Sequence, residues 1–314
     1  MLFQFISLIT LIASNYLAPT QNAHLPLQVN PVIMENPADN ETKEPIGQEV
    51  LAAQTLKGPI RNPRMLGVKL TARSAIVLDK ESGKVLFAKN IHQKLPQASL
   101  TKIMTAITVL DNAPQPDDSI TVGKGPAYVQ PLGAHMRLVA GEKISVYNLL
   151  RGLLMSSAND AAVALGEYIA GSEEKFVDLM NQKAHALGLN DSHFKNTHGI
   201  DTEGHYSSAY DLAEITRYAL NKKIFREIIH TPNISFTTNI RTRFLKNSNK
   251  LLRNSYLNII GGKTGFTDNA GYCLIEVASD KKGHEIITVV MNSQNEWQES
   301  KGLIDWTFRA YQWK

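Results

Sequence analysis

Two pairs of β-strand patterns lie near opposite ends of this chain, and a long stretch of helical periodicity separates them. The first pair covers residues 74–79 and 85–88, and the second covers residues 272–278 and 285–292. The order of two strands, many helices, two strands and a final helix is typical of a layered fold. It predicts an α/β fold in which one antiparallel sheet is built from both chain ends, is covered by helices and carries an inserted, mostly helical region.

Helical periodicity fills the centre of the chain. Apolar residues share one face over residues 103–110. Ser145 and Ser172 are predicted to cap the helices that follow them, because a serine side chain can accept a hydrogen bond from a free N–H group of the first turn. Further helices are predicted over residues 211–220 and 296–311.

Charge and cysteine content exclude several classes of protein. The 314 residues include 33 Lys+Arg and 29 Asp+Glu, which gives a net charge of +4, and no long run of like charges occurs. This balance argues against a nucleic-acid binder, which would cluster its positive charge. Cys273 is the single cysteine, so an intramolecular disulfide and a cysteine-based metal site are excluded. Its place on a predicted strand indicates an inert, buried thiol.

The N-terminal region differs from the remainder. Residues 2–18 are mostly apolar and carry no charge, a length that suits a secretory segment and is short for a membrane span. Residues 1–23 are therefore predicted to be a signal peptide or an N-terminal anchor. Residues 24–65 are predicted to be a proline-rich linker, and residues 66–314 the catalytic domain. We expect an exported protein, in the periplasm or on the outer face of the cytoplasmic membrane, with possible membrane attachment through the N-terminus.

A serine and a lysine three residues apart begin the strongest predicted helix. Ser99 and Lys102 follow Pro96, and positions i and i+3 are neighbours on a helix. If burial lowers the pKa of the lysine, its neutral amine can take the proton of the serine hydroxyl. The S-x-x-K pattern is common by chance, and by itself it is better explained by a capping serine and a surface lysine.

Two further motifs give the S-x-x-K pattern its weight. Ser157-Ala158-Asn159 lies at a predicted junction between two helices, and Lys263-Thr264-Gly265 opens a predicted strand. The three motifs, in this order, resemble the S-x-x-K, S-D-N and K-T-G signature of penicillin-binding proteins and class A β-lactamases, with alanine in place of the aspartate of the middle element. A helix start, a loop and a strand edge are also the structural contexts that the signature requires.

The residues around these motifs resemble the low-molecular-mass penicillin-binding proteins, in particular the serine-type D-alanyl-D-alanine carboxypeptidases. The resemblance covers residues 66–314 and implies a fold like that of DD-peptidases and β-lactamases. The segments that carry it are Ala98–Ala106, Gly152–Ala161, His198–Asp201 with Ser207–Leu212, and Lys263–Tyr272.

The resemblance implies a role for each matching catalytic residue. Ser99 would be the nucleophile, and Lys102 would be its general base. Ser157 would relay a proton to the departing amine, Asn159 would orient Lys102 and bind a substrate amide, and Lys263 would keep the local field positive.

Three residues of the third motif would bind substrate. Thr264 would hydrogen-bond the substrate's terminal carboxylate. The backbone N–H of Phe266, with that of Ser99, would hold the oxyanion of the tetrahedral intermediate. Gly265 would be required because a side chain there would collide with the helix that carries the nucleophile.

The implied activity is removal of the terminal D-alanine from peptidoglycan stem pentapeptides through an acyl-enzyme, with β-lactams as inhibitors and with no cofactor or metal. A DD-endopeptidase that cuts cross-links between stem peptides would use the same residues and stays an alternative. A non-catalytic sensor or scaffold that binds penicillin is another, although such a protein has no need for the full set. A β-lactamase is disfavoured because residues 160–210 lack the E-x-x-L-N setting of a deacylating glutamate.

Three departures from the family pattern have consequences. Ala158 stands where many members have glycine, a small change that should be tolerated. Residues 292–299 contain no arginine, although many members carry one there to hold the substrate carboxylate, so the residue that replaces it is left open. The sequence ends at Trp313-Lys314, directly after the last predicted helix, so the resemblance implies that the small C-terminal domain and anchor of many members are missing.

Histidines offer an alternative kind of site that the spacing does not favour. His185, His193, His198 and His205 lie close together in sequence, but they do not form H-E-x-x-H or H-x-x-E-H. We interpret them as solvated or core residues.

Overall fold

The computed structural model describes residues 58–113 and 115–313. The predicted signal peptide or anchor (residues 1–23) and the linker as far as residue 57 lie outside the described residues. Among the residues that are described, no helix is both long enough and apolar enough to cross a membrane.

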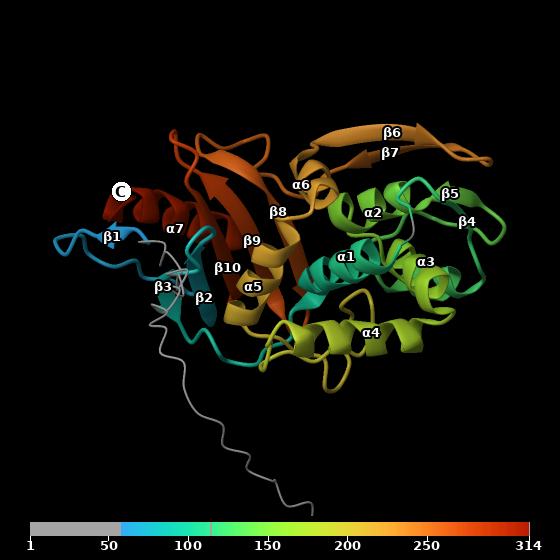
Figure 1. Ribbon diagram of the computed structural model, residues 1–314, viewed down its shortest axis with the longest axis horizontal. Coiled ribbons are helices and arrows are strands. Elements are labelled where there is room, and N and C mark those ends of the chain that lie inside the picture. Colours follow the sequence, from blue (N-terminus) through green and yellow to red (C-terminus); the bar gives the residue numbers. More distant parts are fainter. Residues whose placement is uncertain (1–57, 114, 314) are drawn as a thin grey trace, which may run out of the picture. The chain divides into compact units, whose positions relative to one another are not determined.

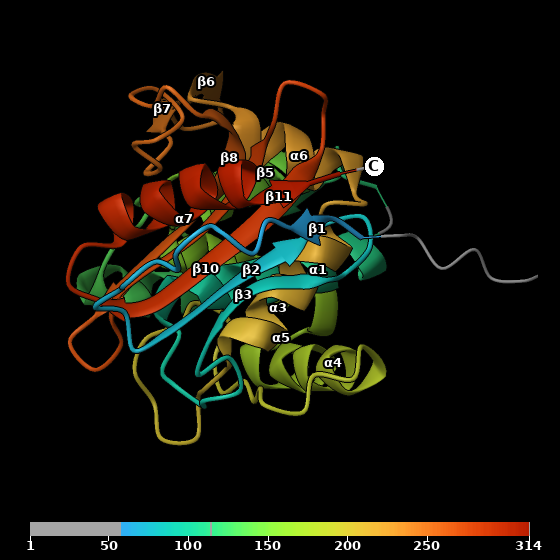
Figure 2. The ribbon, with the colours of Figure 1, turned by 90° about the vertical axis from the view of Figure 1, so that its left-hand side faces the viewer.

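A five-stranded antiparallel sheet forms the frame of the folded unit, in the order β3-β2-β10-β9-β8 (Figures 1 and 2). Its strands are β2 (Ser74–Asp79), β3 (Val85–Lys89), β8 (Asn258–Thr267), β9 (Gly271–Ser279) and β10 (Glu285–Ser293). The predicted sheet from both chain ends is confirmed, because β2 pairs with β10 and places Ile76 opposite Val289. The third motif lies inside β8, which begins at Asn258, whereas the sequence analysis placed the motif at the start of a strand.

Helices occupy both faces of this sheet and the region inserted between the strand pairs. They are α1 (Thr101–Asn112), α2 (Val146–Met155), α3 (Asn159–Ala170), α4 (Glu173–Ala186), α5 (Ala209–Ala219), α6 (Lys223–His230) and α7 (Glu296–Ala310). Both predicted caps are confirmed, since Ser145 accepts a hydrogen bond from the N–H of Asn148 and Ser172 from that of Lys175. Figure 2 shows α7 crossing one face of the sheet, with α5 and α1 on the other.

Several short elements were not predicted from the sequence. They are the strands β1 (Ile60–Arg61), β4 (Ser119–Thr121), β5 (Lys143–Ser145), β6 (Asn233–Thr237), β7 (Thr242–Lys246) and β11 (Tyr311–Gln312), and the 3₁₀ turns η1 (Ala98–Leu100) and η2 (Gly125–Leu132). β1 pairs with β11, so strand pairing begins before residue 66, within the segment predicted as linker.

Alternate residues of the central strands pack into two separate hydrophobic cores, one on each face of the sheet. On β9, Cys273 and Ile275 pack with the inserted helices, whereas Leu274 and Ala278 pack with α7. Because both faces are buried, these strands read as nearly continuous apolar runs. The sheet is therefore a packed frame, and β8 at its edge presents the third motif to the helical region.

Candidate active site

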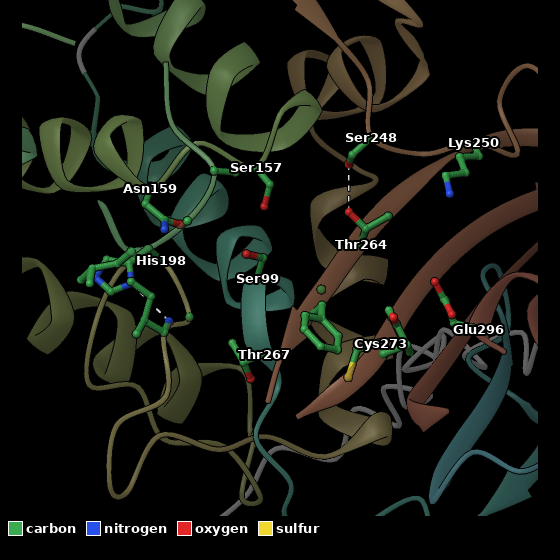
Figure 3. Close-up of a pocket in the computed structure, with 18 of the residues that line it drawn as sticks. Ser99, Ser157, Asn159, His198, Ser248, Lys250, Thr264, Thr267, Cys273 and Glu296 are labelled. Carbon is green, nitrogen blue, oxygen red and sulfur yellow. Dashed lines mark hydrogen bonds between the residues drawn. The ribbon is translucent and has the colours of Figure 1, made fainter. Parts of the chain in front are cut away.

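All three sequence motifs meet in one pocket of about 320 Å³ between β8 and the inserted helices (Figure 3). Ser99 contributes from η1, Ser157 from the link between α2 and α3, Asn159 from the first turn of α3 and Thr264 from β8. Segments more than one hundred residues apart in sequence thus supply neighbouring polar groups, which is the arrangement that the motif order predicted.

Ser99 lies in a tightly constrained turn. The residue before it, Ala98, has a φ of 48°, a left-handed conformation that is uncommon for a residue with a side chain. A Cβ atom on Gly265 would lie 3.2 Å from the Cβ of Ala98 and 3.3 Å from the backbone nitrogen of Ser99. The close approach of β8 to the turn that carries Ser99, which the sequence analysis invoked for Gly265, is present.

The amine of Lys102 lies in direct contact with Ser99. Its Nζ atom is 2.8 Å from the Oγ of Ser99, 2.8 Å from the Oδ1 of Asn159 and 2.5 Å from the backbone oxygen of His198. The side chain is fully buried. Burial, reinforced by the charge of Lys263 and opposed by Asp160, holds the pKa of Lys102 well below its usual range.

Lys263 and Ser157 form a second lysine–serine pair. The Nζ of Lys263 lies 2.9 Å from the Oγ of Ser157 and donates to the backbone oxygen of Thr264 at 2.7 Å. Burial lowers the pKa of Lys263 to about 7, because taking the charged ammonium out of water disfavours it. Ser157 itself has a φ of 61°, a strained conformation that points its hydroxyl into the pocket.

A buried carboxylate fixes the wall opposite β8. Asp160 accepts hydrogen bonds from the backbone N–H groups of Met136 and Leu138, at 2.9 Å each. The N–H of Asn159 donates to the backbone oxygen of Ala134 at 2.7 Å. The first turn of α3 therefore holds the segment 134–138 in place and orients the amide that contacts Lys102.

Thr264 and Phe266 line the β8 side of the pocket. The hydroxyl of Thr264 lies 2.9 Å from that of Ser248, a residue that the sequence analysis did not select. The ring of Phe266 is 53% exposed and lies 4.7 Å from the ring of Tyr272. This side of the pocket thus combines hydroxyl groups with an aromatic surface.

Sequence reasoning missed the groups that reach the pocket from loops. The backbone oxygen of His198 carries no side-chain signal. Ser248 and Lys250 alternate with two asparagines in the segment Asn247-Ser248-Asn249-Lys250, and this repeated polar spacing is the signal that could have marked them.

Of the four histidines, His185 is exposed, His193 is half-buried, and the other two lie in the core. His198 and His205 are buried, and burial is the main cause that lowers the pKa of His198 to about 4 and that of His205 to about 3. Within residues 58–113 and 115–313, no three side chains of His, Cys, Asp or Glu are grouped to hold a metal ion. The prediction for Cys273 is confirmed, since its thiol is buried and its pKa is raised to about 12 by that burial.

The geometry suits acyl transfer through a serine. Two of the three contacts of Lys102, the amide oxygen of Asn159 and the carbonyl of His198, can only accept hydrogen bonds. A neutral amine satisfies both with its two N–H groups and presents its lone pair to the third neighbour, the hydroxyl of Ser99. The neutral amine of Lys102 is thus placed to accept the proton of the Ser99 hydroxyl.

Known proteins share this arrangement of sequence and fold. Residues 61–295 match the family model described as D-alanyl-D-alanine carboxypeptidase, peptidase S11. The D-alanyl-D-alanine carboxypeptidase DacF of Bacillus subtilis (strain 168) is 36% identical over 250 residues, 77% of this chain and 63% of the relative. DacD of Escherichia coli (strain K12) is 39% identical over 253 residues, with coverage of 76% and 63%.

The crystal structure of the Streptomyces K15 DD-transpeptidase has a TM-score of 0.74 at 30% identity and covers 78% of this chain and 99% of that one. The chain spans about 63% of the length of the two curated relatives named above. Because the family model matches most of the sequence, the chain belongs to the peptidase S11 family of D-alanyl-D-alanine carboxypeptidases.

Proposed function

We propose that this protein is a serine-type D-alanyl-D-alanine carboxypeptidase that removes the terminal D-alanine from peptidoglycan stem pentapeptides and is acylated by β-lactams. The observation that carries the proposal is the contact of 2.8 Å between the Nζ of Lys102 and the Oγ of Ser99, made by a lysine whose burial disfavours its charged form. A lysine in this state is a base, and among residues 58–113 and 115–313 Ser99 carries the only hydroxyl within hydrogen-bond distance of its amine.

Acylation begins when Lys102 takes the proton of Ser99 while the serine oxygen attacks the carbonyl carbon between the two D-alanines. The carbonyl oxygen becomes an oxyanion, which the backbone N–H groups of Ser99 and Phe266 stabilise. Each such donor contributes on the order of 10²- to 10³-fold to the rate. The Oγ–C bond forms as the carbonyl π bond opens.

Collapse of this intermediate expels the terminal D-alanine. The C–N bond breaks, and the departing amine takes a proton from Ser157, whose hydroxyl is resupplied from the Lys263 ammonium at 2.9 Å. Water then attacks the acyl carbon, and its proton returns through Ser157 to Lys263, which regains its charge. The Oγ–C bond breaks as Lys102 gives its proton back to the serine oxygen, and the shortened peptide leaves. We infer that the leaving group lies against the hydroxyls of Thr264 and Ser248, which are 2.9 Å apart and line the pocket.

Slow release of penicillin is part of the proposal. Glu296 is the only carboxylate among the described residues that line the pocket. Glu173, at the start of α4, accepts hydrogen bonds from the backbone and the hydroxyl of Thr197 and does not line the pocket. Because residues 160–210 lack the E-x-x-L-N setting of a deacylating glutamate, we expect a stable penicilloyl adduct rather than β-lactamase turnover.

The endopeptidase and sensor alternatives are separated by one experiment. The full chain is incubated with a stem pentapeptide ending in D-Ala-D-Ala and, separately, with cross-linked muropeptide dimers. We expect free D-alanine from the first faster than monomers from the second. Cleavage of dimers alone would replace this proposal with the endopeptidase, and penicillin binding without either reaction would favour the sensor.

The acylated residue is identified with a labelled penicillin and peptide mapping. We expect the label on Ser99, with none in a Ser99→Ala variant. That variant should unfold within about 1 kcal/mol of the original, because it removes one small side chain from the start of a helix. Label on Ser156 or Ser157 would contradict the assignment of the nucleophile.

We propose further that the domain is exported and acts on peptidoglycan in the periplasm or on the outer face of the cytoplasmic membrane, either released or held by residues 1–23. The uncharged apolar stretch over residues 2–18 and the proline-rich segment behind it support this proposal. Cell fractionation, with mass measurement of the mature N-terminus, distinguishes the two forms. Recovery of the full-length chain in the cytoplasm would refute export.

A further inference from the structure

One lysine on the leaving-group side of the pocket has no role in the acyl-transfer steps. Lys250 lines the pocket together with Ser248, Thr264 and Trp297, and its side chain is exposed (Figure 3). The two lysines of the motifs are buried and engaged with serines. Lys250 is therefore the exposed cation on this side of the pocket.

Hydrogen bonds to the interior of the protein fix the backbone on the N-terminal side of Lys250. Asn249 is completely buried, and its amide donates to the Oε2 of the buried Glu276 at 2.9 Å. The N–H of Ser248 donates to the backbone oxygen of Met155 at 2.7 Å. With Asn249 anchored in the interior, its two neighbours, Ser248 and Lys250, both line the pocket.

The ammonium group of Lys250 is held without being neutralised. Its Nζ lies 5.6 Å from the centre of the Trp297 ring, a cation–π distance that restricts the flexible side chain. Within the part of the chain that the structure describes, no carboxylate lies within 4.0 Å of this nitrogen. A positioned, unneutralised cation beside two hydroxyl groups is suited to binding an anion.

We propose that Lys250, with the hydroxyls of Thr264 and Ser248, binds the free C-terminal carboxylate of the substrate and so makes this enzyme selective for peptides that end at that point. The inference rests on the proposed function, since a carboxypeptidase substrate presents this carboxylate one residue beyond the scissile bond. It also supplies a cation for a sequence that has no arginine over residues 292–299, where Glu296 lines the pocket instead.

Glu296 gives the subsite a second property. Its carboxylate lies on the same side of the pocket as Lys250 and is not paired with it (Figure 3). A leaving group with one negative charge can use Lys250, but a second negative charge would meet Glu296. Lys250 and Glu296 together therefore favour a substrate whose terminal residue has a neutral side chain, such as D-alanine, over one whose terminal residue is acidic.

The first test compares two substrates that differ only in the terminal charge. An acylated tripeptide ending in D-Ala-D-Ala and its C-terminal amide are given to the full chain, to Lys250→Gln and to Lys250→Arg, and kcat/KM is measured for each. Lys250→Gln should lower kcat/KM for the free acid by about 10- to 100-fold, the range expected for loss of one hydrogen bond to a charged group. The amide should be unaffected, and Lys250→Arg should keep the preference for the acid.

A matched control removes a positive charge elsewhere. Lys246 is exposed on β7 and does not line this pocket, so Lys246→Gln should leave both substrates unchanged. If Lys250→Gln preserves the preference for the free acid, or lowers both substrates equally, Lys250 does not read the carboxylate and the inference is wrong. Failure of the unmodified protein to turn over either peptide would instead count against the proposed function.

A second measurement is independent of peptide turnover. Penicillin carries a carboxylate that corresponds to the terminal carboxylate of the peptide, and its methyl ester lacks that charge. The acylation rate of Lys250→Gln should fall by about 10- to 100-fold with penicillin and stay the same with the ester. Equal rates for Lys250→Gln and the unmodified protein with penicillin itself would overturn the inference even for a protein that only binds β-lactams.

Discussion

Replacing Lys102 tests whether a neutral lysine is the base. Its side chain is fully buried, it contacts Ser99, Asn159 and the carbonyl of His198, and burial holds its pKa well below the usual range. A positioned general base contributes about 10²- to 10⁴-fold to a rate. Lys102→Met should therefore slow acylation by that factor, which corresponds to about 3 to 5 kcal/mol in the barrier at about 1.36 kcal/mol per tenfold.

The same substitution should change stability little, because two effects oppose each other. Methionine has a similar length and removes the cost of burying an amine, but it leaves the oxygens of Asn159 and His198 without a donor, at about 1 to 3 kcal/mol each. Lys102→Arg should also fail to acylate, since a guanidinium does not deprotonate in this pH range. It should in addition unfold more easily, because it places a fixed charge near Lys263.

Acylation by a labelled penicillin, measured from pH 6 to pH 10 alongside thermal unfolding, checks both expectations. Lys246→Met on the exposed face of β7 serves as a control for loss of a lysine. A Lys102→Met rate within tenfold of the original, or an active Lys102→Arg, would refute the neutral-lysine mechanism.

Three further outcomes are expected. As the pH increases, kcat/KM for the peptide should first rise, because Lys102 loses its proton and becomes a base. It should then fall with an apparent pKa of about 7, because Lys263 loses its proton. A profile without a fall between pH 6 and pH 8 would contradict a charged Lys263. Glu276→Gln should raise the melting temperature at pH 8 more than at pH 4, because burial raises the pKa of Glu276 and its ionisation opposes folding only at higher pH. In the unmodified protein the buried guanidinium of Arg243 lies 2.5 Å from the carboxylate of Glu142. Glu142→Gln should lower the free energy of unfolding by about 3 to 5 kcal/mol in denaturant titrations, because it leaves this buried charge without a counter-ion.

The sequence predicted the parts of this molecule that repeat a local pattern. The strands of the sheet alternate or run apolar over five or more residues, and the helices of the inserted region have capping serines such as Ser145 and Ser172. β6 and β7 were not predicted because each has only two apolar residues in five, and the two of β7, Phe244 and Leu245, are adjacent, so they do not alternate. β1 and β11, two residues each, have no periodicity to detect.

The site likewise contains residues that the sequence predicted and groups that it could not predict. Ser99, Lys102, Ser157, Asn159 and Lys263 were selected from motif spacing, and the structure brings them together. The carbonyl of His198 and the anchoring of Lys250 through Asn249 could not be selected, because both depend on which loop approaches the pocket. Long-range contacts of this kind are set by the packing of the whole fold rather than by neighbouring residues.

The pocket has a cost in stability that varies with pH in two opposite directions. Lys102 and Lys263 have pKa values lowered by burial, so the unfolded chain binds their protons more readily, and stability rises with pH above the folded-state values. Glu276 has a raised pKa and does the reverse, since the folded chain keeps a proton that the unfolded chain loses. Near neutral pH, the decrease in stability with pH caused by Glu276 therefore offsets part of the increase caused by the two lysines. The acid that anchors Asn249, and through it the wall carrying Lys250, thus opposes the pH dependence that the two lysines impose on the fold.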